Sequence, residues 1–258
     1  MHRYATLSKL TTIPFIILFL TISAQTSMAA QCITGSTGLI KVPSVRYLPP
    51  ATFEMGAHVE TYSAVDLIGS ESHDQRIHLK GNYGVLEGLE LGFKKTFDST
   101  DVFEEPDIVI NGKFTFEPLP LGKFTVGLVV DSTINAYNSV YVLYGSPTVF
   151  FGLGGNFGGA SNRLNNWAHF GGYDNLNFKP ESFFFLAGAE FEFGQGRFML
   201  EYDGDAFNAG LRYLLTEQFT LDLFFMGEND YDEFYEARGP WSNKYNRTKA
   251  AIGISSTF

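Results

Sequence analysis

Side chains that could support acid–base or ion-pair chemistry recur at alternate positions along this chain, with apolar residues between them. Successive side chains of a β-strand point to opposite faces, so these groups would share one face of a sheet. Opposite charges on neighbouring strands would pair across the ladder, and in a closed sheet they would line its interior. The residues predicted to form this lining are Glu54, His58, Glu60, Arg76, His78, Lys80, Glu90, Lys94, Glu190, Glu192, Arg197, Glu201, Asp203 and Arg212.

Two uses of such a lining are open at this point. The first is a solvated or ion-paired interior without a specific ligand. The second is a small pore or binding cleft for a polar solute or a glycan segment. Catalysis has little support, because no motif places a nucleophile beside His58 or His78 and the serine signature of outer-membrane phospholipases does not occur. The sequence shows no zinc spacing and no nucleotide loop, so we predict no catalytic residues, no metal and no cofactor.

The elements that must position these residues are β-strands. From residue 51 onward a period-two alternation recurs about twelve times, with turn residues between the runs. In the last run Ile252 and Ile254 face one way and Gly253 faces the other, whereas the runs at 138–145 and 147–156 are less regular. An even strand number, 27 glycines and 16% aromatic residues are typical of outer-membrane barrels. We predict a transmembrane antiparallel up-and-down β-barrel of about twelve strands, with a soluble all-β sandwich or lipid-binding barrel as the alternative.

The amino-terminal segment predicts export. Arg3 gives a positive start, and the apolar run at 13–20 is too short to cross a bilayer as a helix. Small residues around position 27 suit a signal peptidase, so cleavage is expected near Ala29 or Ala30. An uncleaved membrane anchor is the alternative. The predicted location of the mature protein is the bacterial outer membrane.

Short and long connections alternate along the predicted barrel, apart from short ones at 133–137 and 203–206. Short turns face the periplasm in outer-membrane barrels and longer loops face outward, which places both termini on the periplasmic side. The predicted long loops include 63–75, 98–107, 157–181 and 228–246. The resulting division of the chain is a signal peptide at 1–30, a periplasmic N-terminal segment at 31–50 and an outer-membrane barrel at 51–258.

Cys32 is the one cysteine of the sequence, so an internal disulfide is excluded. Lipidation would require a small residue immediately before this cysteine, and Gln31 stands there instead. A bystander thiol or an intermolecular disulfide are the other interpretations.

The net charge of −10 limits the partners. An acidic protein is a poor candidate for nucleic acid, because binding relies on neutralising phosphates. The expected partners are outer-membrane lipid and the barrel-assembly machinery, which recognises a carboxyl-terminal strand. Gly253 and Phe258 fit the general assembly signal, whereas Ala251 and Ser256 depart from it.

Aromatic residues in the predicted loop 157–181 suggest a glycan contact. Trp167 and Tyr173 occur there among amide side chains, and aromatic faces with amides suit sugar stacking and hydrogen bonding. The alternative is that these aromatics belong to the girdle at the membrane interface.

Three sets of short motifs carry a family resemblance. They are Thr37-Gly38-Leu39-Ile40 with Pro43, the hairpin Tyr83-Gly84-Val85 with Gly88-Leu89-Glu90-Leu91-Gly92, and Glu201-Tyr202-Asp203-Gly204 with Asn208-Ala209-Gly210-Leu211-Arg212-Tyr213. These segments resemble the YjbH-type family of outer-membrane β-barrel proteins, which is associated with exopolysaccharide production. The resemblance implies a non-enzymatic protein that assists polysaccharide production or export, with polysaccharide as a partner. A narrow porin-like passive channel for small polar solutes is the second hypothesis, and an outer-membrane lipid-modifying enzyme is the third.

Overall fold

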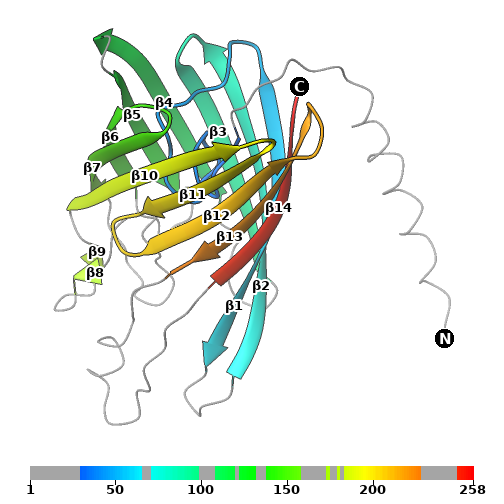
Figure 1. Ribbon diagram of the computed structural model, residues 1–258. Helices are drawn as coiled ribbons and strands as arrows, with labels where there is room; N and C mark the ends of the chain where they lie inside the picture. The colour runs from blue at the N-terminus through cyan, green and yellow to red at the C-terminus, as the bar shows by residue number, and fades with distance from the viewer. Residues whose placement is uncertain are drawn as a thin grey trace, which may run out of the picture.

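The computed structural model describes residues 30–65, 71–98, 108–119, 122–131, 138–157, 173–174, 179–180, 183–227 and 249–258. Within these residues, twelve antiparallel strands close into one barrel (Figure 1). This arrangement confirms the predicted fold class. Among the described residues, no helix is long and apolar enough to span a membrane.

Each barrel strand pairs with its neighbours in chain order, and the first strand pairs with the last. The backbone of Phe53 closes the ring through two hydrogen bonds with Phe258, of 3.0 and 2.7 Å. A separate two-stranded sheet, formed by β8 (Tyr173–Asp174) and β9 (Lys179–Pro180), lies within the segment predicted as a loop. The barrel strands are β1 (Phe53–Val65), β2 (Glu71–Leu86), β3 (Leu89–Asp98), β4 (Ile108–Leu119), β5 (Gly122–Asp131), β6 (Asn138–Gly145), β7 (Val149–Phe157), β10 (Phe183–Phe193), β11 (Gly196–Tyr202), β12 (Phe207–Leu214), β13 (Phe219–Met226) and β14 (Lys249–Thr257).

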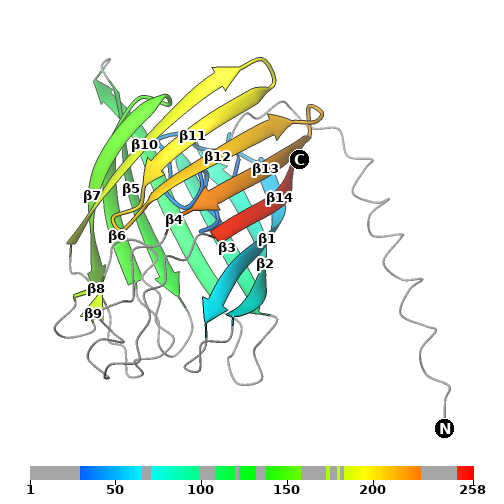
Figure 2. The ribbon, with the colours of Figure 1, turned by 60° about the horizontal axis from the view of Figure 1, so that its bottom comes forward.

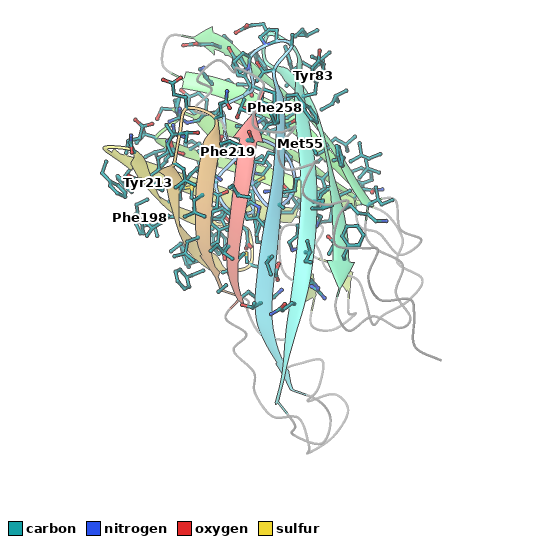
Figure 3. The ribbon with its side chains drawn as sticks, turned by 90° about the vertical axis from the view of Figure 1, so that its right-hand side faces the viewer. Met55, Tyr83, Phe198, Tyr213, Phe219 and Phe258 are labelled. Atoms are coloured by element: carbon teal, nitrogen blue, oxygen red, sulfur yellow. The ribbon has the colours of Figure 1, made fainter. Side chains whose placement is uncertain are left out.

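The outer surface of the barrel is apolar. Residues of the predicted apolar set point outward, and many remain highly exposed, for example Leu153 at 67% and Phe207 at 80%. Figure 3 labels outward aromatic and apolar residues of this surface, among them Tyr83, Tyr213 and Phe219. A continuous apolar surface of this extent is unfavourable in water and suits the hydrocarbon of a bilayer.

The inner surface divides into two walls. The polar wall, on β1–β4 and β11–β14, carries most of the buried charged side chains. The apolar wall, on β5–β7 and β10, explains the two less regular runs at 138–145 and 147–156: there the inward residues are apolar as well, so the alternation is weak. Its main inward side chains are Val129, Tyr141, Leu143, Phe150, Phe184 and Leu186.

The segment before β1 lies inside the barrel. We predicted a periplasmic segment at 31–50, but residues 30–48 are enclosed by the strands, and nearly all of them are buried. Figure 2 shows this blue segment within the ring of strands. Between residues 31 and 48 the charged residues are Lys41 and Arg46 alone, so the segment is too apolar to be stable as an exposed tail. We refer to residues 30–48 as the plug.

Candidate functional site

The plug is held in shape by tight turns. An antiparallel bridge joins Gln31 to Thr37, and a second joins Gly38 to Pro43. Cys32 is fully buried, its N–H donates to the Ser36 carbonyl at 2.9 Å, and its thiol donates to the same oxygen at 3.1 Å. The thiol is therefore part of the internal bonding of the plug and lies among protein atoms.

Two acidic side chains of the barrel bind main-chain N–H groups of the plug. Glu201 on β11 accepts from the N–H groups of three consecutive residues, Ile40, Lys41 and Val42, at 2.8 to 3.1 Å. On β3, Glu90 accepts from the Thr37 N–H and hydroxyl at 2.8 Å and from the Leu48 N–H at 3.1 Å. These donors have no helix or sheet partner, so the carboxylates satisfy buried groups that would otherwise be costly.

Three basic side chains bind main-chain carbonyls of the plug. On β12, Arg212 donates to the carbonyls of Gly38, Leu39 and Gln31 at 2.9 to 3.2 Å. On β4, Lys113 donates to the carbonyls of residues 37, 44 and 46 at 2.6 to 3.1 Å. On β2, Lys80 donates to the carbonyls of residues 31 and 32 at 3.3 and 2.9 Å.

Acids on neighbouring strands orient two of these cations. Asp222 accepts from Arg212 at 2.7 Å, and Glu90 lies 3.1 Å from Lys113. The buried charges are thus compensated by partners and by peptide dipoles, which buried ions require.

The apolar side chains of the plug pack into spaces left by glycines. A methyl group added at Gly188 would lie 2.6 Å from the side chain of Leu39, and one added at Gly210 would lie 3.1 Å from Ile40. Both distances are below ordinary van der Waals contact. Full burial of a Leu or Ile side chain contributes roughly 1.5–3 kcal/mol, so these contacts are a substantial part of the docking energy.

Ion pairs hold both charged side chains of the plug. Lys41 pairs with Asp203, which lies in the connection between β11 and β12. Burial alone would raise the pKa of Asp203, but the Lys41 ammonium and nearby N–H donors outweigh it and hold that pKa below its usual value. Arg46 pairs with Glu190 at 2.6 Å and with Glu192 at 3.1 Å.

Beside Arg46, the Tyr47 hydroxyl donates to the Glu87 carboxylate in the turn after β2. This hydrogen bond raises the pKa of Tyr47 to about 12.

The structure brings the predicted lining residues to the inside of one barrel. Arg76 is half-buried, and Glu192 is exposed but reaches Arg46 and Arg197. The prediction omitted Asn111, Lys113 and Asp222, although each stands at the inward parity of its strand. The remaining predicted residues are buried: Glu54, His58, Glu60, His78, Lys80, Glu90, Lys94, Glu190, Arg197, Glu201, Asp203 and Arg212.

A hydroxyl–imidazole–carboxylate chain lies elsewhere in the lumen. Thr96 Oγ1 is 3.0 Å from His78 Nδ1, and His78 Nε2 is 2.9 Å from Glu60. Their exposures are 6%, 3% and 5%, and the chain faces the lumen rather than the lipid-facing surface. The three side chains are buried on the lumen side of three neighbouring strands, so we interpret the chain as a structural hydrogen-bond ladder across β1–β3. Thr96 was not among the predicted site residues.

A second imidazole, that of His58, is 3.0 Å from Asp222 and stacks on Phe224 at 5.2 Å between ring centroids. Gly253, predicted as part of the assembly signal, leaves room for this ring: a methyl group there would lie 2.3 Å from His58. Phe258 takes part in the closure of the barrel. Of the predicted glycan contacts, Tyr173 contributes its backbone to β8 and Trp167 lies outside the described residues.

Solved structures share this architecture. The NanC porin has a TM-score of 0.52 at 13% identity, covering 78% of this chain and 98% of the porin. An outer membrane phospholipase A from Escherichia coli has a TM-score of 0.48 at 11% identity, covering 89% and 98%. The Acinetobacter baumannii outer membrane protein Omp33 has a TM-score of 0.44 at 10% identity, covering 81% and 97%. No protein-family model and no curated protein matches the sequence. The likeness to NanC shows the fold: the chain is a β-barrel of the outer-membrane type.

Proposed function

We propose that this chain is a non-enzymatic protein of the bacterial outer membrane that assists exopolysaccharide production or export, with a lumen closed by its own plug. The observation that carries the proposal is that the motifs with the YjbH-type resemblance meet in one place. Thr37 of the first motif binds Glu90 of the second at 2.8 Å. Gly38 of the first binds Arg212 of the third at 2.9 Å. Motifs far apart in sequence thus form a single contact site.

This convergence supports the family assignment because the shared residues have a common physical task. Backbone groups of the first motif are bound by charged side chains of the other two, as the contact of Ile40 with Glu201 also shows. If the motifs were features common to all barrel hairpins, we would not expect them to contain these inward charged residues. The polysaccharide role is what the resemblance implies, and it is part of the proposal.

The plug weighs against the passive-channel hypothesis. A porin-like conduit requires a hydrated path, whereas the backbone of residues 30–48 occupies the lumen and binds the polar wall. The enzyme hypothesis has less support still, because the hydroxyl–imidazole–carboxylate chain of Thr96, His78 and Glu60 is buried away from lipid.

The test is deletion of the gene in the source bacterium, with secreted exopolysaccharide measured per cell. Secretion should fall several-fold and return when the wild-type gene is supplied. A variant that combines Glu201→Gln with Arg212→Gln should reach the membrane but restore less polysaccharide, because the plug loses contacts with the polar wall. The matched control, Glu217→Gln at an exposed turn, should restore secretion fully. Normal secretion by the deletion strain would contradict the proposal.

A further inference from the structure

Glu54 is the buried acid with the poorest compensation among the described residues. Its exposure is 1%, its Oε1 accepts the Gln31 N–H at 3.2 Å, and its Oε2 has no hydrogen-bond partner. Glu201 has several donors but no ion pair. The other buried acids are paired with cations or imidazoles: Glu60, Glu90, Glu190, Asp203 and Asp222. A buried carboxylate without such a partner is unfavourable by several kcal/mol.

A second acceptor next to Glu54 also lacks a donor. The Gln31 side chain donates through Nε2 to the Glu54 carbonyl at 3.2 Å, but its Oε1 has no partner. The nearby cations are engaged elsewhere, since Lys80 donates to the carbonyls of residues 31 and 32 and Arg212 to plug carbonyls and Asp222. Two unsatisfied buried oxygens, one of them on a carboxyl group, define a place for a positively charged group with several N–H donors.

The chain itself can supply this group. Ala30 is buried at 4% exposure, and its carbonyl accepts the Gly38 N–H at 3.0 Å. Its nitrogen is three covalent bonds from the Gln31 nitrogen that already binds Glu54, a separation of about 3 Å. The preceding residues Ser27 and Ala29 are small, as a signal peptidase requires.

We infer that hydrolysis of the Ala29–Ala30 peptide bond completes the lumen, because the new α-ammonium group of Ala30 binds the Glu54 carboxylate and the Gln31 side-chain oxygen. The signal peptidase of the export pathway adds one water across the amide. The carboxylate leaves with residues 1–29, and the amine on Ala30 takes up a proton. Removal of residues 1–29 therefore creates a buried ion pair, and closure of the barrel depends on this step of export. This inference rests on the export signal and not on the polysaccharide role.

The first test is the amino-terminus of the protein purified from outer membranes. Sequencing and intact mass should give Ala30 as the first residue. A mature chain that begins at any other residue would overturn the inference, since its amino group would not lie one residue before the N–H that binds Glu54.

The second test is a double-mutant cycle on refolded protein. One chain begins at Ala30, and the other carries two additional glycines before it, which move the amino group away from Glu54. The extension should lower the midpoint of thermal unfolding by roughly 5–10 °C, and Glu54→Gln should do the same, since either change breaks a buried pair. Together they should lower it no further than one alone. In the Glu54→Gln variant the side-chain amide oxygen can still accept from the Gln31 N–H. A hydrogen bond would therefore survive the substitution, whereas an ion pair would be lost.

The matched control is Glu192→Gln, an exposed acid whose effect should add to that of the extension. An amine-reactive reagent near pH 7 should modify the α-amino group slowly in the wild type and many-fold faster in the Glu54→Gln variant. Fully additive losses from the extension and Glu54→Gln, or an extension without effect, would overturn the inference and show Glu54 to be a neutral acid.

Discussion

The polar and apolar walls of the lumen hold the same segment by different means. On the polar wall, Glu201 and Arg212 bind peptide groups of the plug, and Glu90 also accepts from the Thr37 hydroxyl. The apolar wall, with Phe150 and Leu186 at its centre, packs with the side chains of the plug in one buried cluster. The plug therefore satisfies its backbone on the polar wall, whereas its apolar side chains pack in a cluster that also includes Met199 and Phe224 from the polar-wall strands.

The two kinds of contact differ in how strongly they depend on the sequence of the plug. Hydrogen bonds to main-chain groups tolerate many side chains, because every residue except proline offers the same donor and acceptor. Packing depends more closely on sequence, since the space beside Gly188 on the apolar wall fits Leu39 and the space beside Gly210, on β12 of the polar wall, fits Ile40. We expect the polar wall to set the path of the plug and the apolar wall to supply most of the docking energy.

Removing the plug should have the largest effect, because it leaves both walls without a partner. Deletion of residues 31–48 should convert a barrel that carries no current into one with discrete conductance steps in planar bilayers. Heat-modifiable gel mobility should confirm that the shortened barrel is folded. A synthetic peptide of residues 31–48 should block the steps. Equal conductance of the intact and shortened proteins would show that the plug does not close the lumen.

On the apolar wall, Phe150→Ala should lower the free energy of unfolding by about 3–5 kcal/mol, because it opens a cavity beneath the plug. Urea titration in lipid vesicles measures the loss. The control is Phe151→Ala on the same strand, where the side chain is 51% exposed on the outer surface. If the two variants lose equal stability, the apolar wall has no special role.

On the polar wall, Glu201→Gln should cost about 2–3 kcal/mol, less than the apolar truncation. The amide retains one acceptor but turns an NH₂ group toward backbone donors, which leaves buried N–H groups unsatisfied. The same urea titration measures this loss, and Glu217→Gln at an exposed turn should be neutral. If Glu201→Gln lowered the free energy of unfolding more than Phe150→Ala does, the polar wall would contribute more to the docking energy than the apolar wall.

The ion pair between Lys41 and Asp203 should give a pH-dependent contribution of about 1–2 kcal/mol. The folded state lowers the pKa of Asp203, so the stabilisation is complete above the unfolded pKa, near 4, and is lost as the pH falls toward the lower folded pKa. The stability difference between the wild type and Asp203→Asn should therefore shrink on acidification below about pH 4. A difference that is constant with pH would assign the effect to shape rather than charge.

The smallest effect is expected at Tyr47, where the variant Tyr47→Phe should cost less than about 1 kcal/mol. The folded pKa of about 12 exceeds the ordinary value of 10.0, so the stabilisation is present below pH 10 and is lost as the pH rises toward 12. Absorbance titration should show one fewer late-ionising tyrosine in the variant. Loss of a tyrosine that ionises in the ordinary range, in place of a late-ionising one, would show that the Glu87 contact is not made.

The barrel could be predicted from sequence because its two faces differ in polarity along most strands. Alternation in β1, β2 and β12 is strong. In β12, for example, the inward Arg212 stands between the outward residues Leu211 and Tyr213. Where the inward residues are apolar too, as at Tyr141 and Leu143, the period-two signal weakens although the strand is present.

The position of the plug could not be predicted from periodicity, because the plug has no regular structure. Its apolar composition and its few charges were the available signal. The contacts of Glu90 and Lys113 with it depend on a closed barrel, so local sequence cannot show which backbone groups these side chains bind. Lys113 was within reach of parity reasoning but was not selected.

The placement of the plug also sets an order of events during assembly. Residues 30–48 are translated before any strand, yet Glu201 and Arg212 bind them across separations of 159 to 181 residues. Contacts between such distant positions form late, because a long loop must close first. Residues 30–48 must therefore remain without these partners until almost the last strand has been made. We expect this interval to be the one in which periplasmic chaperones matter most.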